Sequence, residues 1–210
     1  LVVAPSGTGK TTLLQEIAKC TAGEAKVILL LLGQRPEESA ESRANLPGAL
    51  VLSAPFDSSY EEQAQLARLA LECGKRIAEE GGNALLLLDS MPAYVRAAEK
   101  TAADAESAKL DCRKFFASAR KLDGGGSLTV LATTDEAGAE EFISASNSVL
   151  YLAREYTAFG IPAVDLLRSG TKRAETLLGE REQEAVRQLR RTAAEKGMAA
   201  AFALAETFTI

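Results

Sequence analysis

The first eighteen residues combine a short apolar run, a loop of small residues and the start of a helical pattern. Residues 1–3 are apolar, residues 4–9 read Ala-Pro-Ser-Gly-Thr-Gly, and residues 10–18 carry apolar side chains at helical spacing. A strand that enters a helix through such a loop is the layout of a phosphate-binding P-loop. An ordinary glycine-rich turn is the alternative, since the strict P-loop pattern requires glycine where this chain has Ala4.

Four residues of this loop have an expected role. Gly7 and Gly9 let backbone N–H groups wrap a β-phosphate, Lys10 reaches the β- and γ-phosphate oxygens, and the Thr11 hydroxyl binds Mg²⁺. We therefore expect the chain to bind ATP together with Mg²⁺. The residues expected to hold the phosphates are Ala4, Pro5, Ser6, Gly7, Thr8, Gly9, Lys10, Thr11 and Thr12.

A second nucleotide signal lies near the middle of the chain. Residues 85–88 are four leucines, and Asp89 follows them directly. An apolar strand that ends in a carboxylate has the form of a Walker B element, in which the aspartate holds Mg²⁺ directly or through water. Alone this signal is weak, because an aspartate after a strand is often a turn or helix N-cap residue. Together with the P-loop it indicates a Mg²⁺–nucleotide site.

Six short apolar runs alternate with helical patterns along the 210 residues. This alternation predicts an α/β fold with a mostly parallel central sheet flanked by helices, in a single domain spanning residues 1–210 that is helical from about residue 171. We expect one helix to bury Leu66, Leu69 and Ile77, and another over residues 103–121 to bury Leu110 and Phe115. The apolar runs are residues 1–3, 27–32, 50–53, 84–88, 128–132 and 149–152.

Composition excludes several classes of function. The net charge of −5 gives no basic field for nucleic acid, and the chain has no histidine for acid–base catalysis. Its three cysteines, Cys20, Cys73 and Cys112, lack metal-ligand spacing and indicate reduced thiols. No apolar run approaches the roughly 18 residues of a membrane span. We expect a cytoplasmic protein without a signal peptide or membrane contact.

Eight short blocks carry a family resemblance: residues 3–11, 35–38, 86–90, 113–116, 125–129, 140–142, 162–165 and 168–171. In this order they resemble the ATPase domain of the bacterial transcription termination factor Rho, a RecA-like hexameric RNA translocase related to the rotary ATP synthase catalytic subunits. The resemblance covers nearly the whole chain. It implies a RecA-like P-loop NTPase core and a homo-oligomeric ring with each nucleotide at a subunit interface. We expect any N-terminal RNA-binding domain to be absent from this chain.

The chain departs from that family at residues expected to act on the nucleotide. Gln34, beside Arg35, stands where the family has the glutamate that orients the attacking water. Lys172, followed by Arg173, stands at the position of the family's arginine finger, which acts in trans. If Arg173 lies on a helix, it points about 100° away from Lys172. Ile161 replaces the aromatic residue that stacks on adenine, with Phe159 two residues earlier.

The two segments expected to grip RNA are also altered. The connection between Arg96 and Arg113 is short and alanine-rich, and residues 134–139 are short and acidic. RNA remains a possible partner, but these segments do not supply the cationic loops that a translocating motor requires.

Three functions follow from this combination. The first is a degenerate Rho-like ATP-binding domain with weakened or absent hydrolysis. The second is an active Rho-type RNA-dependent ATPase, in which Glu37, Glu38, Arg173 or flanking sequence supplies the missing groups. The third is a non-enzymatic assembly module whose interfaces are stabilised by nucleotide.

Overall fold

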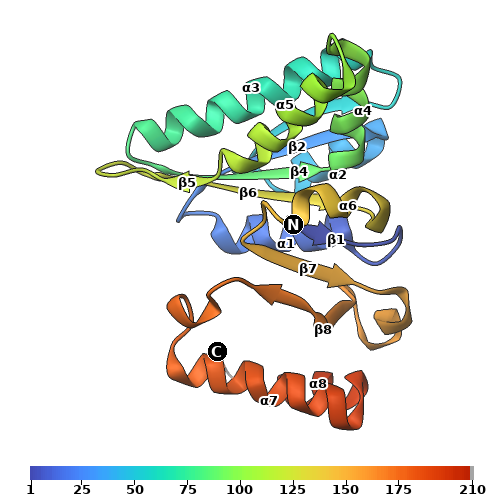
Figure 1. Ribbon diagram of the computed structural model, residues 1–210, viewed down its shortest axis with the longest axis vertical. Helices are drawn as coiled ribbons and strands as arrows, with labels where there is room; N and C mark the ends of the chain where they lie inside the picture. Colours follow the sequence, from blue (N-terminus) through green and yellow to red (C-terminus); the bar gives the residue numbers. More distant parts are fainter. Residues whose placement is uncertain (209–210) are drawn as a thin grey trace.

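The computed structural model describes residues 1–208, in which one twisted sheet is flanked by helices on both faces (Figure 1). The strand order is β3-β2-β4-β6-β1-β7-β8, with β5 paired to β6. The strands are β1 (Val2–Val3), β2 (Lys26–Gln34), β3 (Leu50–Pro55), β4 (Asn83–Asp89), β5 (Arg120–Lys121), β6 (Ser127–Thr134), β7 (Ser148–Leu152) and β8 (Val164–Thr171). The helices are α1 (Lys10–Thr21), α2 (Pro36–Asn45), α3 (Tyr60–Glu79), α4 (Met91–Thr101), α5 (Ala105–Ala117), α6 (Glu136–Ile143), α7 (Glu180–Lys196) and α8 (Met198–Ala205), with 3₁₀ helices η1 (Arg154–Phe159) and η2 (Ala174–Thr176).

The mostly parallel sheet confirms the expected fold class. Strands β3, β2, β4, β6, β1 and β7 run parallel, while β5 and β8 pair antiparallel with their neighbours. The central strands β2 and β4 are apolar almost throughout because helices cover both of their faces. Each of the six apolar runs lies at a strand. The sequence pattern missed β5 and β8, which have no continuous apolar run.

Alternate residues of the central strands enter two separate cores. Leu30, Leu86 and Leu88 pack with the α3–α6 side, and Leu29 and Leu87 pack with α1. This division follows from the two-residue period of a strand, which points successive side chains to opposite faces. The sheet is therefore fixed in register from both sides.

Two expected helices differ in detail from the structure. Helix α3 begins with a capping box between Ser59 and Glu62 and buries a stripe of small residues, so Leu69 is exposed rather than buried. Helix α5 ends at Ala117 instead of residue 121, because the chain turns there into β5. It buries Phe115 as expected, but Leu110 faces solvent.

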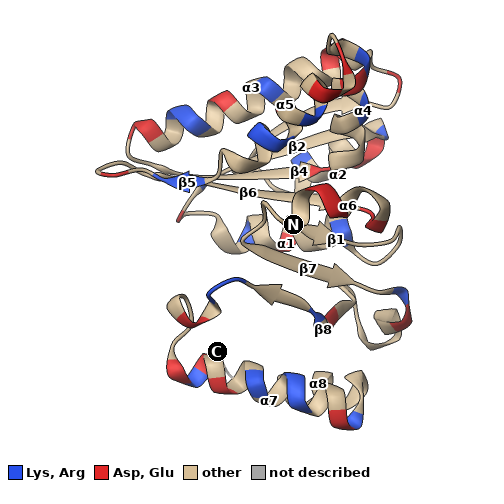
Figure 2. Ribbon diagram, viewed as in Figure 1, with Lys and Arg blue, Asp and Glu red and all other residues tan. Residues whose placement is uncertain are grey.

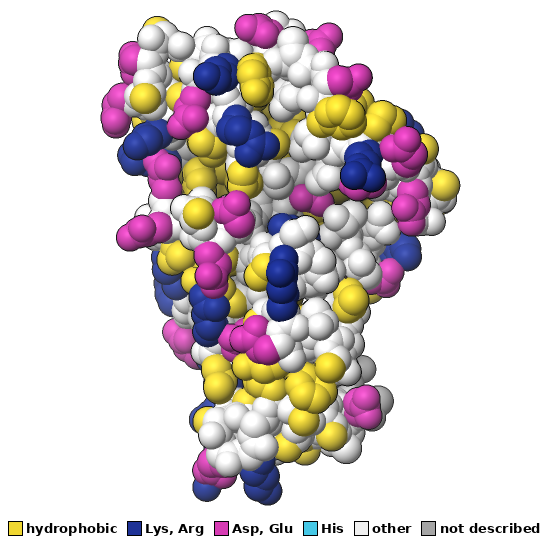
Figure 3. Space-filling model, turned by 90° about the vertical axis from the view of Figure 1, so that its right-hand side faces the viewer, with side chains coloured by type: hydrophobic (Ala, Val, Ile, Leu, Met, Phe, Trp, Pro, Cys, Tyr) yellow, Lys and Arg dark blue, Asp and Glu magenta, His cyan; other side chains and the backbone are white. Residues whose placement is uncertain are grey.

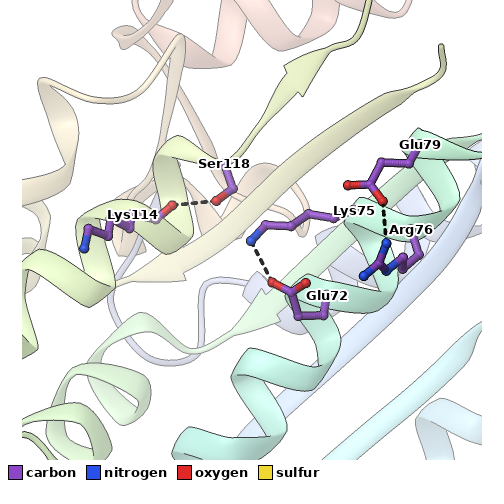
Figure 4. Close-up of polar contacts among 6 residues, drawn as sticks. All are labelled: Glu72, Lys75, Arg76, Glu79, Lys114 and Ser118. Atoms are coloured by element: carbon purple, nitrogen blue, oxygen red, sulfur yellow. Dashed lines mark hydrogen bonds and ion pairs between the residues drawn. The ribbon is translucent and has the colours of Figure 1, made fainter.

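Ion pairs lie along the outer surface of α3 (Figure 4). Lys75 binds Glu72 at 2.7 Å and Arg76 binds Glu79 at 3.0 Å, each partner one turn away on the same helix. All four side chains are exposed, so each pair contributes only about 0.3–0.5 kcal/mol. The pairs also neutralise these cations, which agrees with the absence of a strong basic field in the composition.

The segments that were expected to replace RNA-gripping loops are largely helical. Residues 97–112 form the end of α4, a three-residue connection and most of α5. A single residue, Asp135, separates β6 from α6, and its side chain caps the helix by accepting the Gly138 N–H at 2.8 Å. Arg113 of α5 binds Glu141 of α6 at 3.1 Å. In Figure 2 part of the α6 ribbon is red, the colour of aspartate and glutamate.

The C-terminal part of the chain packs against the last strand. Helices α7 and α8 form a hairpin that contacts β8 and η1, below the sheet in Figure 1. Its small core contains Ala193, Met198 and Ala201, with Tyr156 and Phe202 packed beside them. No helix among residues 1–208 is long and apolar enough to span a membrane.

The carboxylate of Asp165 fixes an irregular stretch at the start of β8. One of its oxygens accepts the backbone N–H groups of Leu167 and Arg168 at 3.0 and 3.1 Å, and the side chain is buried. We expect Asp165→Ala to lower the free energy of unfolding by about 2 kcal/mol, since two partly buried N–H groups lose a charged acceptor. Urea denaturation measures this, and Asp123→Ala, at an exposed site, serves as the control. Equal midpoints for the two variants would contradict this role.

The three cysteines are free thiols with different access to solvent. Burial raises the pKa of Cys112 to about 12, whereas Cys20 is exposed on α1. Only the thiolate reacts with alkylating agents, so the folded protein at pH 8 should incorporate label rapidly at Cys20 and not at Cys112. Peptide mapping after iodoacetamide treatment measures this. Equal labelling of both thiols below the unfolding transition would show that Cys112 is accessible.

Candidate nucleotide-binding site

The P-loop lies between the end of β1 and the first turn of α1. Gly7 and Gly9 have φ angles of 82° and 92°, in the left-handed region that glycine adopts without steric cost. Gly9 is the N-cap of α1, so the free N–H groups of the helix open toward the loop. The Thr8 hydroxyl donates to the Pro5 carbonyl at 2.9 Å and fixes the turn. The loop therefore has the backbone geometry of an anion cradle.

Alanine at position 4 is compatible with this geometry. Its side chain is fully buried in a small cluster with Val2 and Leu152. Its backbone N–H donates to the Thr134 carbonyl at 2.9 Å, which ties the start of the loop to β6. The Cβ atom therefore fills a core position and does not enter the concave side of the loop.

Lys10 and Asp89 bring charge to the loop from two elements. The Lys10 ammonium donates to the Ala4 carbonyl at 3.1 Å, so the side chain lies back across the loop. Asp89, at the end of β4, accepts the Thr11 hydroxyl at 2.9 Å and is 2% exposed. Ser90, not Asp89, is the N-cap of α4. The structure therefore joins the two sequence signals at one site.

Thr133 is a site residue that the sequence analysis missed. Its hydroxyl donates to the other carboxylate oxygen of Asp89 at 2.8 Å. Leu88 pairs with Ala132 across β4 and β6, so Asp89 and Thr133 end neighbouring parallel strands. The sequence signal that could have indicated Thr133 is its position as a polar residue directly after the apolar run at residues 128–132.

The donor atoms around Asp89 fit Mg²⁺. They are the Thr11 hydroxyl and the carboxylate, both hard oxygen ligands. Within residues 1–208 no group of three histidine, cysteine or acidic residues could hold a metal ion. Magnesium does not need one, since it commonly takes one or two protein ligands and completes its shell with water and phosphate oxygens.

Gln34 and Arg35 lie at the same edge of the sheet. Leu31 of β2 pairs with Asp89, and Gln34 ends that strand three residues further on. The Gln34 carbonyl accepts the Phe56 N–H at 3.2 Å, and its side chain is half-buried. Arg35 is exposed and is the N-cap of α2. Both residues are thus close to the carboxyl end of β4 without entering the core.

Lys172 and Arg173 lie at the opposite edge of the sheet from the P-loop of their own chain. Strand β8 runs antiparallel to β7, so the end of β8 lies beside the start of β7. Thr171 pairs with Ser148, about 13 Å along β7 from Leu152, the residue nearest the start of the P-loop. Lys172 donates to the Ser144 carbonyl at the end of α6, at 2.9 Å. Arg173 has a φ of 56° and precedes η2, so it does not continue a helix from Lys172 and the 100° offset does not apply.

The segment after β7 covers one side of the P-loop. The Ile161 side chain lies directly over Gly9, where any Cβ atom would collide with it. The Ala163 N–H donates to the Thr8 carbonyl at 3.2 Å, and Arg154 Nε donates to the Ser6 carbonyl at 3.3 Å. No sequence motif pointed to Arg154. Figure 3, which views the carboxyl edge of the sheet, shows hydrophobic side chains gathered in its lower half.

A parallel α/β sheet with a P-loop after β1 and a buried aspartate after β4 defines a P-loop nucleotide-binding domain. The profile of the "ATP synthase alpha/beta family, nucleotide-binding domain" matches residues 1–171, and the chain belongs to this family.

Individual relatives show which proteins of this family the chain resembles. The chain is 40% identical to the transcription termination factor Rho of Streptomyces coelicolor and 37% identical to that of Thermotoga maritima, over 91% of its length. It spans about half of each, 51% and 49%. A prototypical ATPase from a bacterial type III secretion system shares the fold, with a TM-score of 0.81 over 92% of this chain and 62% of its own, at 22% identity. The chain is thus a Rho-like domain.

Asp89→Asn tests whether Asp89 helps to bind Mg²⁺. The amide is nearly isosteric but lacks the charge that attracts Mg²⁺, so we expect it to remove the gain in ATP affinity that Mg²⁺ gives, a loss of about tenfold or more. Calorimetric titration with and without Mg²⁺ measures this. Lys10→Ala, the comparison variant, should weaken binding in both conditions. An unchanged magnesium dependence in Asp89→Asn would remove Asp89 from the metal site.

Proposed function

We propose that this domain binds ATP with Mg²⁺ and hydrolyses it slowly or not at all. The observation that supports this proposal is the contrast between a P-loop joined by a hydrogen bond to a buried aspartate and an amide, Gln34, where the resemblance implies a carboxylate. The binding half consists of the P-loop, Lys10, Thr11 and Asp89. For hydrolysis, the resemblance implies a glutamate at position 34, and this chain has no acidic group there.

The binding step follows from the chain's own groups. The P-loop N–H groups and the α1 N-terminus would hold the β-phosphate, and Lys10 would leave the Ala4 carbonyl for phosphate oxygens. Thr11 and Asp89 would hold Mg²⁺, which when bound neutralises charge on the phosphates. Thr133 keeps the Asp89 carboxylate in one orientation.

The chemical step is weakened because Gln34 cannot accept a proton at neutral pH. Its amide can still orient a water molecule, as the glutamine of small GTPases does. Loss of a general base typically slows a reaction about 10²- to 10⁴-fold. Residual turnover is therefore consistent with this site, but efficient turnover is not.

The position of Lys172 and Arg173 supports a site shared between copies. Neither residue can reach its own P-loop from the other edge of the sheet, so either can act only on the nucleotide of a neighbouring subunit. Lys172 is engaged at the end of α6, where a cation is favourable, and Arg173 is exposed beside it. We propose a homo-oligomeric ring in which Arg173 is the better candidate for the trans contact.

RNA gripping is not supported by the surface near α6. Asp135, Glu136 and Glu140 lie in or beside its first turns, and the connection from β6 is one residue long. Phosphate backbones are held by lysine and arginine, and an acidic helix repels them. We propose that RNA neither binds here nor stimulates turnover.

Gln34→Glu tests the missing base. Restoring a carboxylate at the end of β2 should raise the rate of phosphate release at saturating ATP by about tenfold or more, with little change in ATP affinity. A phosphate-release assay beside a calorimetric titration measures both. Gln188→Glu, the same change at an exposed position on α7, should leave both unchanged. If wild type and Gln34→Glu release phosphate at the same rate, the amide is not what limits hydrolysis.

A further inference from the structure

We infer that the surface around β5 binds an acidic segment of another protein, with one apolar side chain of that segment in a cavity. The β5 surface is defined by Lys75 of α3, Lys114 of α5, and Arg120 and Lys121 of β5. Because β5 pairs with the first residues of β6, this surface lies at the amino ends of the parallel strands, away from the nucleotide site. The inference goes beyond the proposed function and does not depend on it.

The β5 surface carries unpaired positive charge in a protein whose net charge is −5. Within residues 1–208, Lys114, Arg120 and Lys121 take part in no ion pair. The fourth cation, Lys75, binds Glu72 at 2.7 Å (Figure 4). Three cations from two neighbouring elements are therefore available to an anionic partner, and complementary charge favours such an encounter.

Two carboxylates lie near these cations without cancelling them. Glu79 borders the same region, but its side chain binds Arg76 at 3.0 Å on the outer surface of α3. Asp123 follows β5 in an exposed turn and does not line the cavity beside Arg120. The β5 ribbon itself is blue in Figure 2, the colour of lysine and arginine. The charge that remains unpaired beside the cavity is therefore positive.

A cavity of about 280 Å³ lies between α3, the end of α5 and β5. Lys75 and Arg120 border it, and in Figure 4 Lys75 extends from α3 toward Ser118 at the end of α5. Its apolar lining consists of Ala78, Leu122 and Leu128. Pockets for small molecules usually measure about 300–1,000 Å³, so this cavity is suited to a single side chain. An apolar residue flanked by acidic residues would fill it and place carboxylates beside the cations.

The turn after β5 holds the backbone of this surface in place. The Gly126 N–H donates to the Ala78 carbonyl of α3 at 2.9 Å, and the Gly126 carbonyl accepts the Leu122 N–H at 2.9 Å. Gly126 lies so close to Gly82 that a Cβ atom there would collide with the Gly82 carbonyl. Strand β5 is thus fixed to α3 and to β6, so a partner binds it without ordering a mobile loop.

The lining of the cavity favours a peptide over a nucleic acid. No aromatic side chain among residues 1–208 lines it, whereas proteins that hold single-stranded nucleic acid stack its bases on aromatic rings. An acidic peptide requires cations and an apolar contact, and both are present here. Exposed charge pairs are individually weak and are screened by salt, so we expect transient, salt-sensitive binding.

The test uses the whole chain without nucleotide and a fluorescein-labelled peptide of glutamates around a central leucine. Fluorescence anisotropy at about 50 mM salt should show saturable binding, which weakens about tenfold or more at about 300 mM salt. Arg120→Gln should weaken binding about fivefold, and the further change Lys121→Gln should weaken it again. Arg181→Gln, which removes an exposed arginine from α7, should leave the affinity unchanged. A peptide with alanine in place of leucine should bind about threefold more weakly.

Four outcomes would overturn the inference. The first is an absence of binding, and the second is equal binding of the glutamate peptide and of a peptide with glutamines in their place. The third is unchanged affinity in Arg120→Gln. The fourth is displacement of the peptide by polycytidylic RNA at lower concentrations than by unlabelled peptide, which would assign the surface to phosphate groups. A lower sedimentation coefficient of Arg120→Gln itself would assign the surface to a second copy of the chain and would also overturn it. Because nucleotide is absent, none of these results bears on the proposed ATP site.

Discussion

The hydrogen bond between Thr11 and Asp89 joins the two parts of the chain on which the site depends. Thr11 lies in the first turn of the helix after β1, and Asp89 ends β4, 78 residues later. Between these strands lies β6, whose Thr133 holds the other carboxylate oxygen. A buried carboxylate is costly unless its oxygens are satisfied, so the two threonines make this placement possible. The P-loop and Asp89 are thereby held in fixed relation.

The sheet separates the residues expected to bind nucleotide from the residues proposed to act on a neighbouring copy. The P-loop, Asp89 and Gln34 lie at the carboxyl ends of the parallel strands, where α/β sheets bind their ligands. The antiparallel β8 carries Lys172 and Arg173 to the other edge. The groups proposed to bind the phosphates, Lys10 included, therefore lie within one chain, while the proposed contact of Lys172 or Arg173 would come from a neighbour. Loss of hydrolysis would leave the proposed binding site intact.

Sequence periodicity predicted the parallel sheet because its central strands are apolar on both faces. The P-loop and Asp89 were also predictable, because their chemistry requires fixed residue types after a strand. The register between β4 and β6 was not, so Thr133 was missed. Leu69 and Leu110 were wrongly expected to be buried. Helical spacing shows which residues share a face, but not which part of that face contacts the core. Contacts between distant segments, such as Phe159 with Phe202, leave no local signal.

The most direct test of this account measures binding and turnover in one wild-type sample. ATP with Mg²⁺ is titrated calorimetrically, and phosphate release is then followed with and without polycytidylic RNA. The account predicts saturable ATP binding, with phosphate release that is slow or absent and is not stimulated by RNA. Release at about 1 s⁻¹ or faster when RNA is added would contradict it, because the domain would then be a working RNA-dependent ATPase despite Gln34.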